Sequence, residues 1–126
     1  MANIVLIDDD SLTRELLGRL LTELGHTVSL AADGVEGLKA IGTQSTDLVI
    51  TDLVMPNKEG IETIMELRRV HPQVKIIAIS GGRDPGFVER NLLIASRLGA
   101  NQSLKKPFTR EQLERALADA LHPKQR

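Results

Sequence analysis

Three short runs of consecutive apolar residues stand out along the chain, at 4–7, 48–50 and 76–79. Runs of this length that are rich in Ile, Val and Leu are typical of parallel strands buried on both faces. Residues 27–30 alternate between polar and apolar side chains, and residues 101–105 form the least apolar of the five candidate strands. We therefore expect three central strands, with the second and the fifth strand at opposite edges of one sheet.

Helical periodicity fills the stretches between these strands, and one further helical stretch follows the last strand. The expected inward positions are Leu12, Leu16, Leu17, Leu20, Leu21 and Leu24 in the first helix, Val35, Leu38 and Ile41 in the second, Ile61, Ile64, Met65 and Leu67 in the third (about 61–70), Val88, Leu92, Ala95 and Leu98 in the fourth (87–98), and Leu113, Leu117 and Leu121 in the fifth. Capping boxes at Asp33 to Glu36 and Thr109 to Gln112 mark two helix starts. This alternation predicts an α/β doubly wound parallel sheet with right-handed crossovers and helices on both faces.

Composition narrows the class of protein. The chain has 126 residues, which predicts a single domain over 1–126 with no output domain, and residues 124–126 form only a short tail. It contains no Cys, no membrane-length apolar run and no basic start of a secretory signal, so we expect a cytoplasmic protein. A net charge of -1 and the absence of Tyr and Trp argue against direct binding of nucleic acid or of a membrane.

Polar side chains gather where the expected strands end. Asp8 and Asp9 follow the first strand, Asp52 the third, Ser80 the fourth and Lys106 the fifth. The carboxyl ends of parallel strands meet at one edge of a sheet, so these side chains should lie together. Carboxylates at 4 Å repel one another by roughly 4 kcal/mol per pair at an effective dielectric near 20. This repulsion predicts that the cluster binds a cation. Because the ligands are oxygens, with no His or Cys among them, they favour magnesium over zinc.

The remaining polar groups suit a substrate that carries its own negative oxygens. A hydroxyl from Ser80 and an ammonium from Lys106 fit a phosphoryl group. In this interpretation the Asp52 carboxylate is the nucleophile, while the metal and Lys106 neutralise charge in the transition state.

These residues lie in the motifs LIDDDS (6–11), ITDLVMPNKEG (50–60) and KPF (106–108), which resemble those of the receiver domains of two-component response regulators. The resemblance runs over essentially the whole chain and implies a flavodoxin-like fold with strand order 2-1-3-4-5. It implies that Asp52 is the phosphoacceptor. It also implies that Asp8, Asp9, Asp52 and the backbone carbonyl of Val54 hold Mg²⁺.

The resemblance assigns further roles. Ser80 matches the Ser or Thr that moves to hydrogen-bond the phosphoryl oxygen. Lys106 rather than Lys105 matches the family's lysine, because Pro107 and Phe108 follow it directly, and the bond from Lys106 to Pro107 is expected to be cis. Asp10 lies one place beyond the usual acidic pair and is interpreted as a helix cap or surface acid.

Three departures from the family pattern are expected to matter. Ser103 stands where receivers commonly carry an aromatic residue that reports phosphorylation. The stretch SGGRDPG (80–86) is longer than usual and predicts an extended, glycine-loosened loop. Val54 and Gly82 stand at the two positions that often tune loss of the phosphoryl group, and neither side chain can orient a hydrolytic water. Self-dephosphorylation should therefore rely on backbone and metal alone.

The sequence thus predicts a stand-alone, magnesium-dependent phosphoacceptor that switches conformation, and not an enzyme beyond its own phosphorylation and dephosphorylation. The expected donor is a sensor histidine kinase or a histidine phosphotransfer protein, and the expected output is an unknown downstream protein. Monomer and phosphorylation-dependent dimer both stay open. The alternatives are a phosphorelay intermediate that passes the phosphoryl group to a second histidine, a receiver-like module that is not phosphorylated, and a phosphohydrolase. Val54 argues against the phosphohydrolase, since it occupies the place of that class's general acid.

Overall fold

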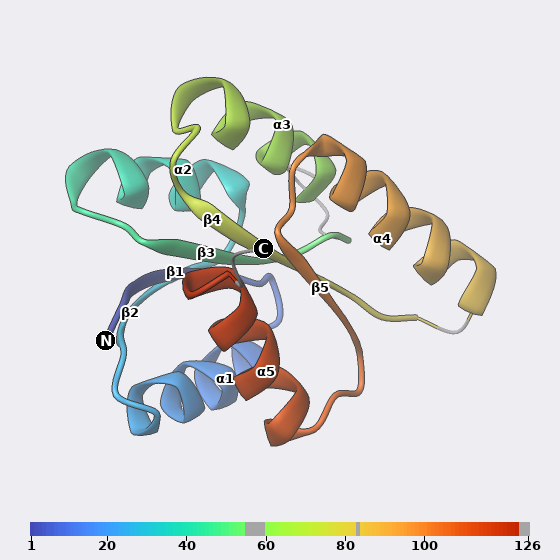
Figure 1. Cartoon of the computed structure of the whole chain (residues 1–126), viewed down its shortest axis with the longest axis horizontal. Helices are drawn as coiled ribbons and strands as arrows, with labels where there is room; N and C mark the ends of the chain where they lie inside the picture. The colour runs from blue at the N-terminus through green and yellow to red at the C-terminus, as the bar shows by residue number, and fades with distance from the viewer. Residues whose placement is uncertain (55–59, 83, 124–126) are drawn as a thin grey trace.

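The computed structural model describes residues 1–54, 60–82 and 84–123. Within these residues, five parallel strands alternate with five helices, and the strands follow the order β2-β1-β3-β4-β5 (Figure 1). The strands are β1 (Asn3–Ile7), β2 (Thr27–Ala31), β3 (Leu48–Asp52), β4 (Lys75–Ser80) and β5 (Gln102–Lys105), and the helices are α1 (Ser11–Glu23), α2 (Gly34–Thr43), α3 (Gly60–Val70), α4 (Pro85–Leu98) and α5 (Arg110–Leu121). The predicted doubly wound α/β fold, its strand order and its two edge strands are confirmed. Residues 55–59 of the motif ITDLVMPNKEG and the tail at 124–126 lie outside the described residues.

Two helical layers enclose the sheet: α1 and α5 cover one face, and α2, α3 and α4 cover the other (Figure 1). Strand β1 shows the division, because Leu6 packs in the cluster with α1 and α5 while Val5 and Ile7 pack in the other cluster. Every residue of β3 is buried. The middle residues of the central strands are apolar because both faces of these strands are covered.

The register of the sheet places the strand ends side by side. Strand β3 pairs with β1 up to Thr51, so that Asp8 follows β1 beside Asp52 at the end of β3. Ser80 ends β4 and pairs with Lys105, the last residue of β5. The polar residues that follow β1, β3, β4 and β5 are therefore brought to one edge of the sheet.

Four of the expected inward positions are wrong: Leu12, Leu16, Val35 and Met65 are exposed, Leu12 to 63%. Each of these helices carries apolar residues over a wider part of its surface than the part that faces the sheet. Helix α1, for example, packs around Leu17, and the 3.6-residue period turns Leu12 and Leu16 away from it.

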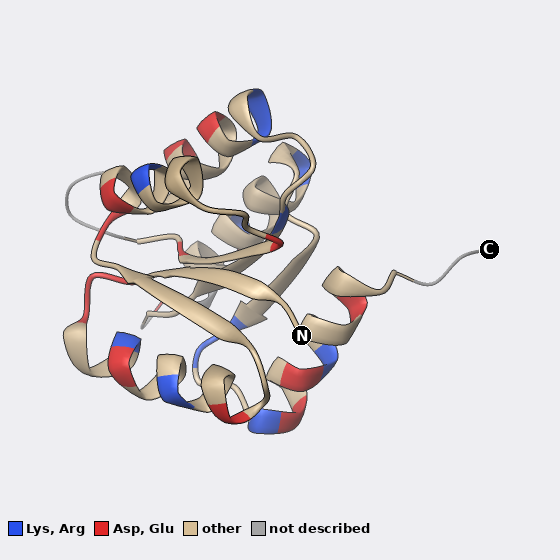
Figure 2. Ribbon diagram, turned by 90° about the vertical axis from the view of Figure 1, so that its left-hand side faces the viewer, with Lys and Arg blue, Asp and Glu red and all other residues tan. Residues whose placement is uncertain are grey.

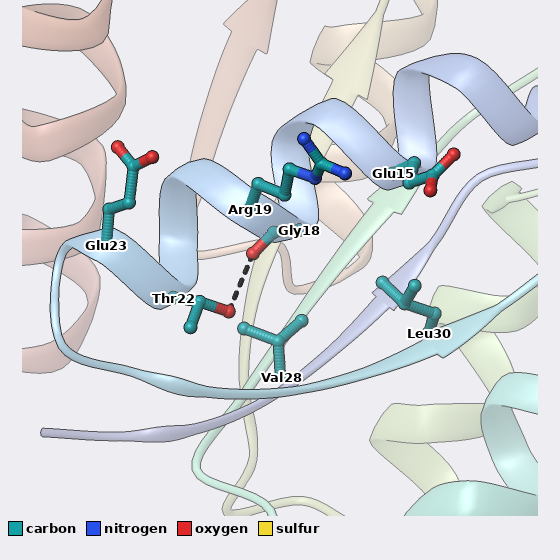
Figure 3. Close-up of a pocket in the computed structure, with 7 residues that line it drawn as sticks. All are labelled: Glu15, Gly18, Arg19, Thr22, Glu23, Val28 and Leu30. Atoms are coloured by element: carbon teal, nitrogen blue, oxygen red, sulfur yellow. Dashed lines mark hydrogen bonds between the residues drawn. The ribbon is translucent and has the colours of Figure 1, made fainter.

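Glycines occupy some of the inward places instead. A Cβ added at Gly37 would lie 2.3 Å from Ile7 Cδ1, so α2 approaches the sheet more closely than a side chain would allow. On α1, a Cβ at Gly18 would lie 3.0 Å from a methyl carbon of Leu30. Figure 3 shows the groove of about 400 Å³ that α1 and β2 form here; none of the strand-end polar residues lines it.

Helix α4 begins earlier than expected, which corrects the predicted loop at 80–86. Asp84 is its N-cap, with the carboxylate accepting from the Gly86 N–H at 2.9 Å, and Pro85 occupies the first turn. Proline is favoured there because its missing N–H has no partner in a first turn. Residues 81–84 separate β4 from α4, and residues 85–86 already belong to the helix; residue 83 is outside the described part of the chain.

Of the two predicted capping boxes, the one at α5 is confirmed and the one at α2 forms only in part. Thr109 and Gln112 form the reciprocal capping box expected for α5. Asp33 accepts from the Glu36 N–H at 2.9 Å, but the Glu36 carboxylate accepts from the Ala32 N–H, one residue before the cap. Across the described residues, the helices lack the length and apolar character that crossing a membrane requires.

Arg68, in the last turn of α3, closes the edge of the sheet at the amino ends of the strands. Its guanidinium donates to the carbonyls of Gly99, Pro72 and Val74 and to Oδ1 of Asn101, with distances to Gly99 of 3.0 and 2.8 Å. Burial lowers the pKa of Arg68. A Cβ at Gly99, where φ is +120°, would lie 2.7 Å from Arg68 Nε. One side chain thus ties α3, the start of β4 and the end of α4 together.

Candidate functional site

Three carboxylates converge at the carboxyl edge of the sheet. One oxygen each of Asp8, Asp9 and Asp52 lies within 4.8 Å of the others. Asp8 and Asp52 are only 2% and 8% exposed, whereas Asp9 is exposed. Asp8 and Asp9 lie between β1 and α1, and Figure 2 shows acidic residues in red where the chain turns into α1. The cluster therefore joins two buried carboxylates to one that faces solvent.

Lys106 is the cation of this cluster. Its ammonium lies 3.0 Å from Asp52 Oδ2 and 3.4 Å from Asp8 Oδ2. Its backbone N–H donates to the Ser80 carbonyl at 2.8 Å, and the bond to Pro107 is cis, as expected. The neighbouring Lys105 instead pairs with Glu89 on the surface. Lys106, not Lys105, is thus the lysine that reaches the carboxylates.

The charges at the site are only partly balanced. Burial raises the pKa of Asp8, and the charge of Asp52 acts in the same direction, against the hydrogen bond from the Asp10 N–H and the attraction of Lys106. Burial alone would lower the pKa of Lys106, but its hydrogen bonds and charge interactions with Asp52 and Asp8 raise it. The cluster accordingly favours additional positive charge, and its oxygen-only donors fit Mg²⁺.

Ser80 brings a hydroxyl group without a protein partner. The residue is completely buried, and its Oγ makes no hydrogen bond to any residue that the structure describes. Leaving a buried hydroxyl unpaired costs about 1–3 kcal/mol. The Ser80 hydroxyl therefore keeps an unused hydrogen-bonding group at the end of β4.

The backbone after β3 also contributes. The Val54 N–H donates to Asp52 Oδ1 at 3.2 Å, while the Val54 side chain is 43% exposed. Gly82, the other position singled out for phosphoryl loss, has a φ of +143°. Neither position places a polar side chain at the carboxylates.

Ser103 is exposed on β5. It lines a hollow of about 730 Å³ between α4 and β5, together with Leu92, Leu93, Leu104 and the stem of Lys106. The small side chain at this position thus leaves open space on the outer side of the strand that leads to Lys106.

Two residues at the site escaped the sequence analysis. Gly60 starts α3 directly against β3. A Cβ at this position would lie 2.2 Å from the Asp52 carbonyl oxygen, so only glycine allows this close approach. Arg14 of α1 donates to the Asp8 carbonyl at 2.7 Å. The motif that ends at Gly60 does not show why a glycine is needed there, and nothing in the local pattern distinguishes Arg14 from a surface arginine.

Comparison with known proteins identifies related chains. The family model described as "Response regulator receiver domain" matches residues 4–118. The chain is 35% identical over 121 residues to transcriptional regulatory protein GlrR of Escherichia coli K12, covering 95% of this chain but 26% of that protein. It is 37% identical over 110 residues to response regulator MprA of Mycobacterium ulcerans, covering 87% of this chain and 46% of the relative. The chain thus spans a quarter to a half of these two relatives.

Solved structures give the same result. A response regulator receiver domain protein from Clostridium thermocellum has a TM-score of 0.87 and 32% identity, over 96% of this chain and 94% of that one. Chemotaxis protein CheY4 of Vibrio cholerae has a TM-score of 0.85 and 28% identity, over 96% and 99% of the two chains. The strand order, the convergence of the acidic residues and these matches lead to one conclusion: the chain belongs to the response regulator receiver domain family.

Proposed function

We propose that Asp52 accepts a phosphoryl group from a phosphohistidine of a sensor histidine kinase or a histidine phosphotransfer protein. Mg²⁺ would be held by Asp8, Asp9, Asp52 and the backbone carbonyl of Val54, and would neutralise charge on the phosphoryl oxygens. One observation carries the proposal: three carboxylates lie within 4.8 Å of one another, with the Lys106 ammonium 3.0 Å from Asp52.

The protein's own groups have distinct roles in this transfer. A carboxylate oxygen of Asp52 attacks phosphorus, the phosphorus–nitrogen bond to the donor histidine breaks, and an acyl phosphate forms while the imidazole leaves. Lys106 stays beside Asp52 and offsets the charge that the phosphoryl group brings. The Ser80 hydroxyl, which lacks a protein partner among the described residues, donates to a phosphoryl oxygen.

The acyl phosphate then biases the domain between two conformations. Ser80 and Lys106 respond to the new charge, and both belong to segments that lead to the surface of α4 and β5. The hollow at Ser103 gives the stem of Lys106 space on that side. We propose that this surface presents the change to the downstream partner.

Response regulator receiver domains interact with histidine kinases and with downstream effectors. For this chain we propose a single receiver domain that acts alone, through protein contacts or through onward transfer to a second histidine. Its cytoplasmic location, and the choice between monomer and phosphorylation-dependent dimer, stay predictions.

Incubation with acetyl phosphate and Mg²⁺, followed by intact mass measurement, tests the proposal. Wild type should gain one phosphoryl group, Asp52→Asn should gain none, and the control Asp119→Asn on α5 should behave as wild type. Continuous consumption of donor without stable uptake would indicate a phosphohydrolase. No uptake by wild type would indicate a receiver-like interaction module, the alternative that Ser103 favours.

A further inference from the structure

In the turn between β1 and α1, hydrogen bonds fix the two peptide groups that flank Asp9. The peptide group before Asp9 is fixed through the Asp8 carbonyl, which accepts from Arg14 Nη1 at 2.7 Å. The peptide group after it is fixed through the Asp10 N–H, which donates to Asp8 Oδ1 at 2.9 Å. Both bonds come from side chains, so neither belongs to the regular pattern of the strand or the helix.

Asp9 itself has no such support. No hydrogen bond or ion pair from the described residues reaches its carboxylate, and the side chain is exposed. One of its oxygens nevertheless lies within 4.8 Å of oxygens of Asp8 and Asp52. The two peptide planes that flank a Cα set the direction of its Cα–Cβ bond and so the region that the carboxylate can reach, and for Asp9 these are the planes that Arg14 and Asp8 hold.

We propose that Arg14 is a positioning residue for the metal site, acting through the Asp8–Asp9 peptide to aim the Asp9 carboxylate at the shared ligand position. The inference rests on the magnesium site of the proposed function and adds to it a residue that touches neither the metal nor the phosphoryl group. Groups that orient metal ligands in this way typically change metal affinity 10–100-fold when removed.

The charge of Arg14 would act in the opposite direction. A guanidinium near the cluster repels Mg²⁺, so removing its charge alone would tighten binding. Loss of the hydrogen bond, in contrast, releases the Asp8–Asp9 peptide and weakens binding. The sign of the change in affinity therefore distinguishes positioning from simple electrostatics.

Magnesium titration of the unphosphorylated protein tests the inference. The chain has no Trp and no Tyr, so the amide resonances of Asp9 and Asp10 are a better signal than intrinsic fluorescence. Arg14→Met should raise the Kd for Mg²⁺ about tenfold. Arg14→Lys, which keeps the charge and one donor group, should fall between Arg14→Met and wild type. The matched control Arg19→Met, exposed on the same helix (Figure 3), should leave the Kd unchanged.

Thermal unfolding without Mg²⁺ gives the second readout. Positioning predicts that Arg14→Met lowers the unfolding temperature by no more than the loss of one hydrogen bond allows, yet loses Mg²⁺ affinity about tenfold, while Arg19→Met changes neither quantity. In an Asp9→Asn background, Arg14→Met should cause no further loss, since the ligand it aims is gone. An equal loss in that background would overturn the route through Asp9.

An unchanged or lower Kd in Arg14→Met would overturn the inference while leaving the proposed function intact. If Arg14→Met does not fold, a wild-type Kd in Arg14→Lys and in Arg14→Gln would overturn it equally. Failure of wild type itself to bind Mg²⁺ would overturn both this inference and the metal site on which it rests.

Discussion

The polar groups at the two edges of the sheet differ in how well their hydrogen bonds and charges are paired. At the amino edge, the Arg68 guanidinium donates to three backbone carbonyls and one side-chain amide oxygen. At the carboxyl edge, Asp8, Asp9 and Asp52 crowd together with Lys106 as their close cation, and the Ser80 hydroxyl lacks a partner among the described residues.

Within one fold, the amino edge contributes to stability and the carboxyl edge is suited to bind ligands. The hydrogen bonds of Arg68 at the amino edge hold α3, β4 and the end of α4 together. Repulsion and an unmade hydrogen bond at the carboxyl edge cost folding energy that a cation and a phosphoryl group are suited to recover. Mutations at the amino edge should therefore change the free energy of unfolding, and mutations at the carboxyl edge should change Mg²⁺ binding and phosphorylation.

The largest expected effect on stability is at the amino edge. Arg68→Met should lower the free energy of unfolding by about 2–3 kcal/mol, because it leaves several part-buried acceptors unpaired. Urea unfolding measures this, with Arg69→Met, exposed on the same turn, as control. Mg²⁺ affinity should stay at the wild-type value. A variant that lost metal affinity along with stability would show that the edges are not independent.

Removing a carboxylate at the other edge should have the opposite effect on stability. Asp8→Asn should raise the free energy of unfolding without Mg²⁺ by about 1 kcal/mol near pH 7, because the cost of burying the charged carboxylate outweighs the lost attraction of Lys106. The same variant should bind Mg²⁺ much more weakly than wild type. Lower stability in Asp8→Asn would mean that the pair with Lys106 dominates.

The pH dependence of this effect has a definite sign. The pKa of Asp8 is raised in the folded protein above its unfolded value of 3.8, so the ionised group costs stability as pH rises through that interval. The difference between Asp8→Asn and wild type should therefore be largest at neutral pH and vanish below about pH 3.8. Unfolding curves of both proteins from acid to neutral pH check this, and a constant difference would contradict it.

The smallest expected effect concerns only the phosphorylated state. Val54 is exposed beside Asp52 and carries no polar group, so Val54→Asn and Val54→Glu should each change the half-life of the phosphoryl group by orienting or excluding water. Stability should change by less than about 0.5 kcal/mol, as for other surface positions. Val70→Asn, on the exposed end of α3, is the control. Unchanged decay in both Val54 variants would disprove a role for this position.

Much of this molecule follows from its linear pattern. Apolar runs predicted the central strands, and the requirement that parallel strands end at one edge brought Asp8, Asp52 and Lys106 together before any coordinates. The helix faces were less predictable, because Leu12 and Val35 extend apolar stripes past the surface that the sheet covers.

What the sequence by itself determined are the alternation of strands and helices, the caps and the strand-end chemistry, since these depend on neighbours a few residues apart. Only the tertiary structure decided that Arg68 meets Gly99, that Gly60 packs on the Asp52 carbonyl and that Arg14 holds the Asp8 peptide. The first two contacts join separate elements. The third depends on how the chain bends between β1 and α1, so that its geometry exists only once the sheet and the helices have packed.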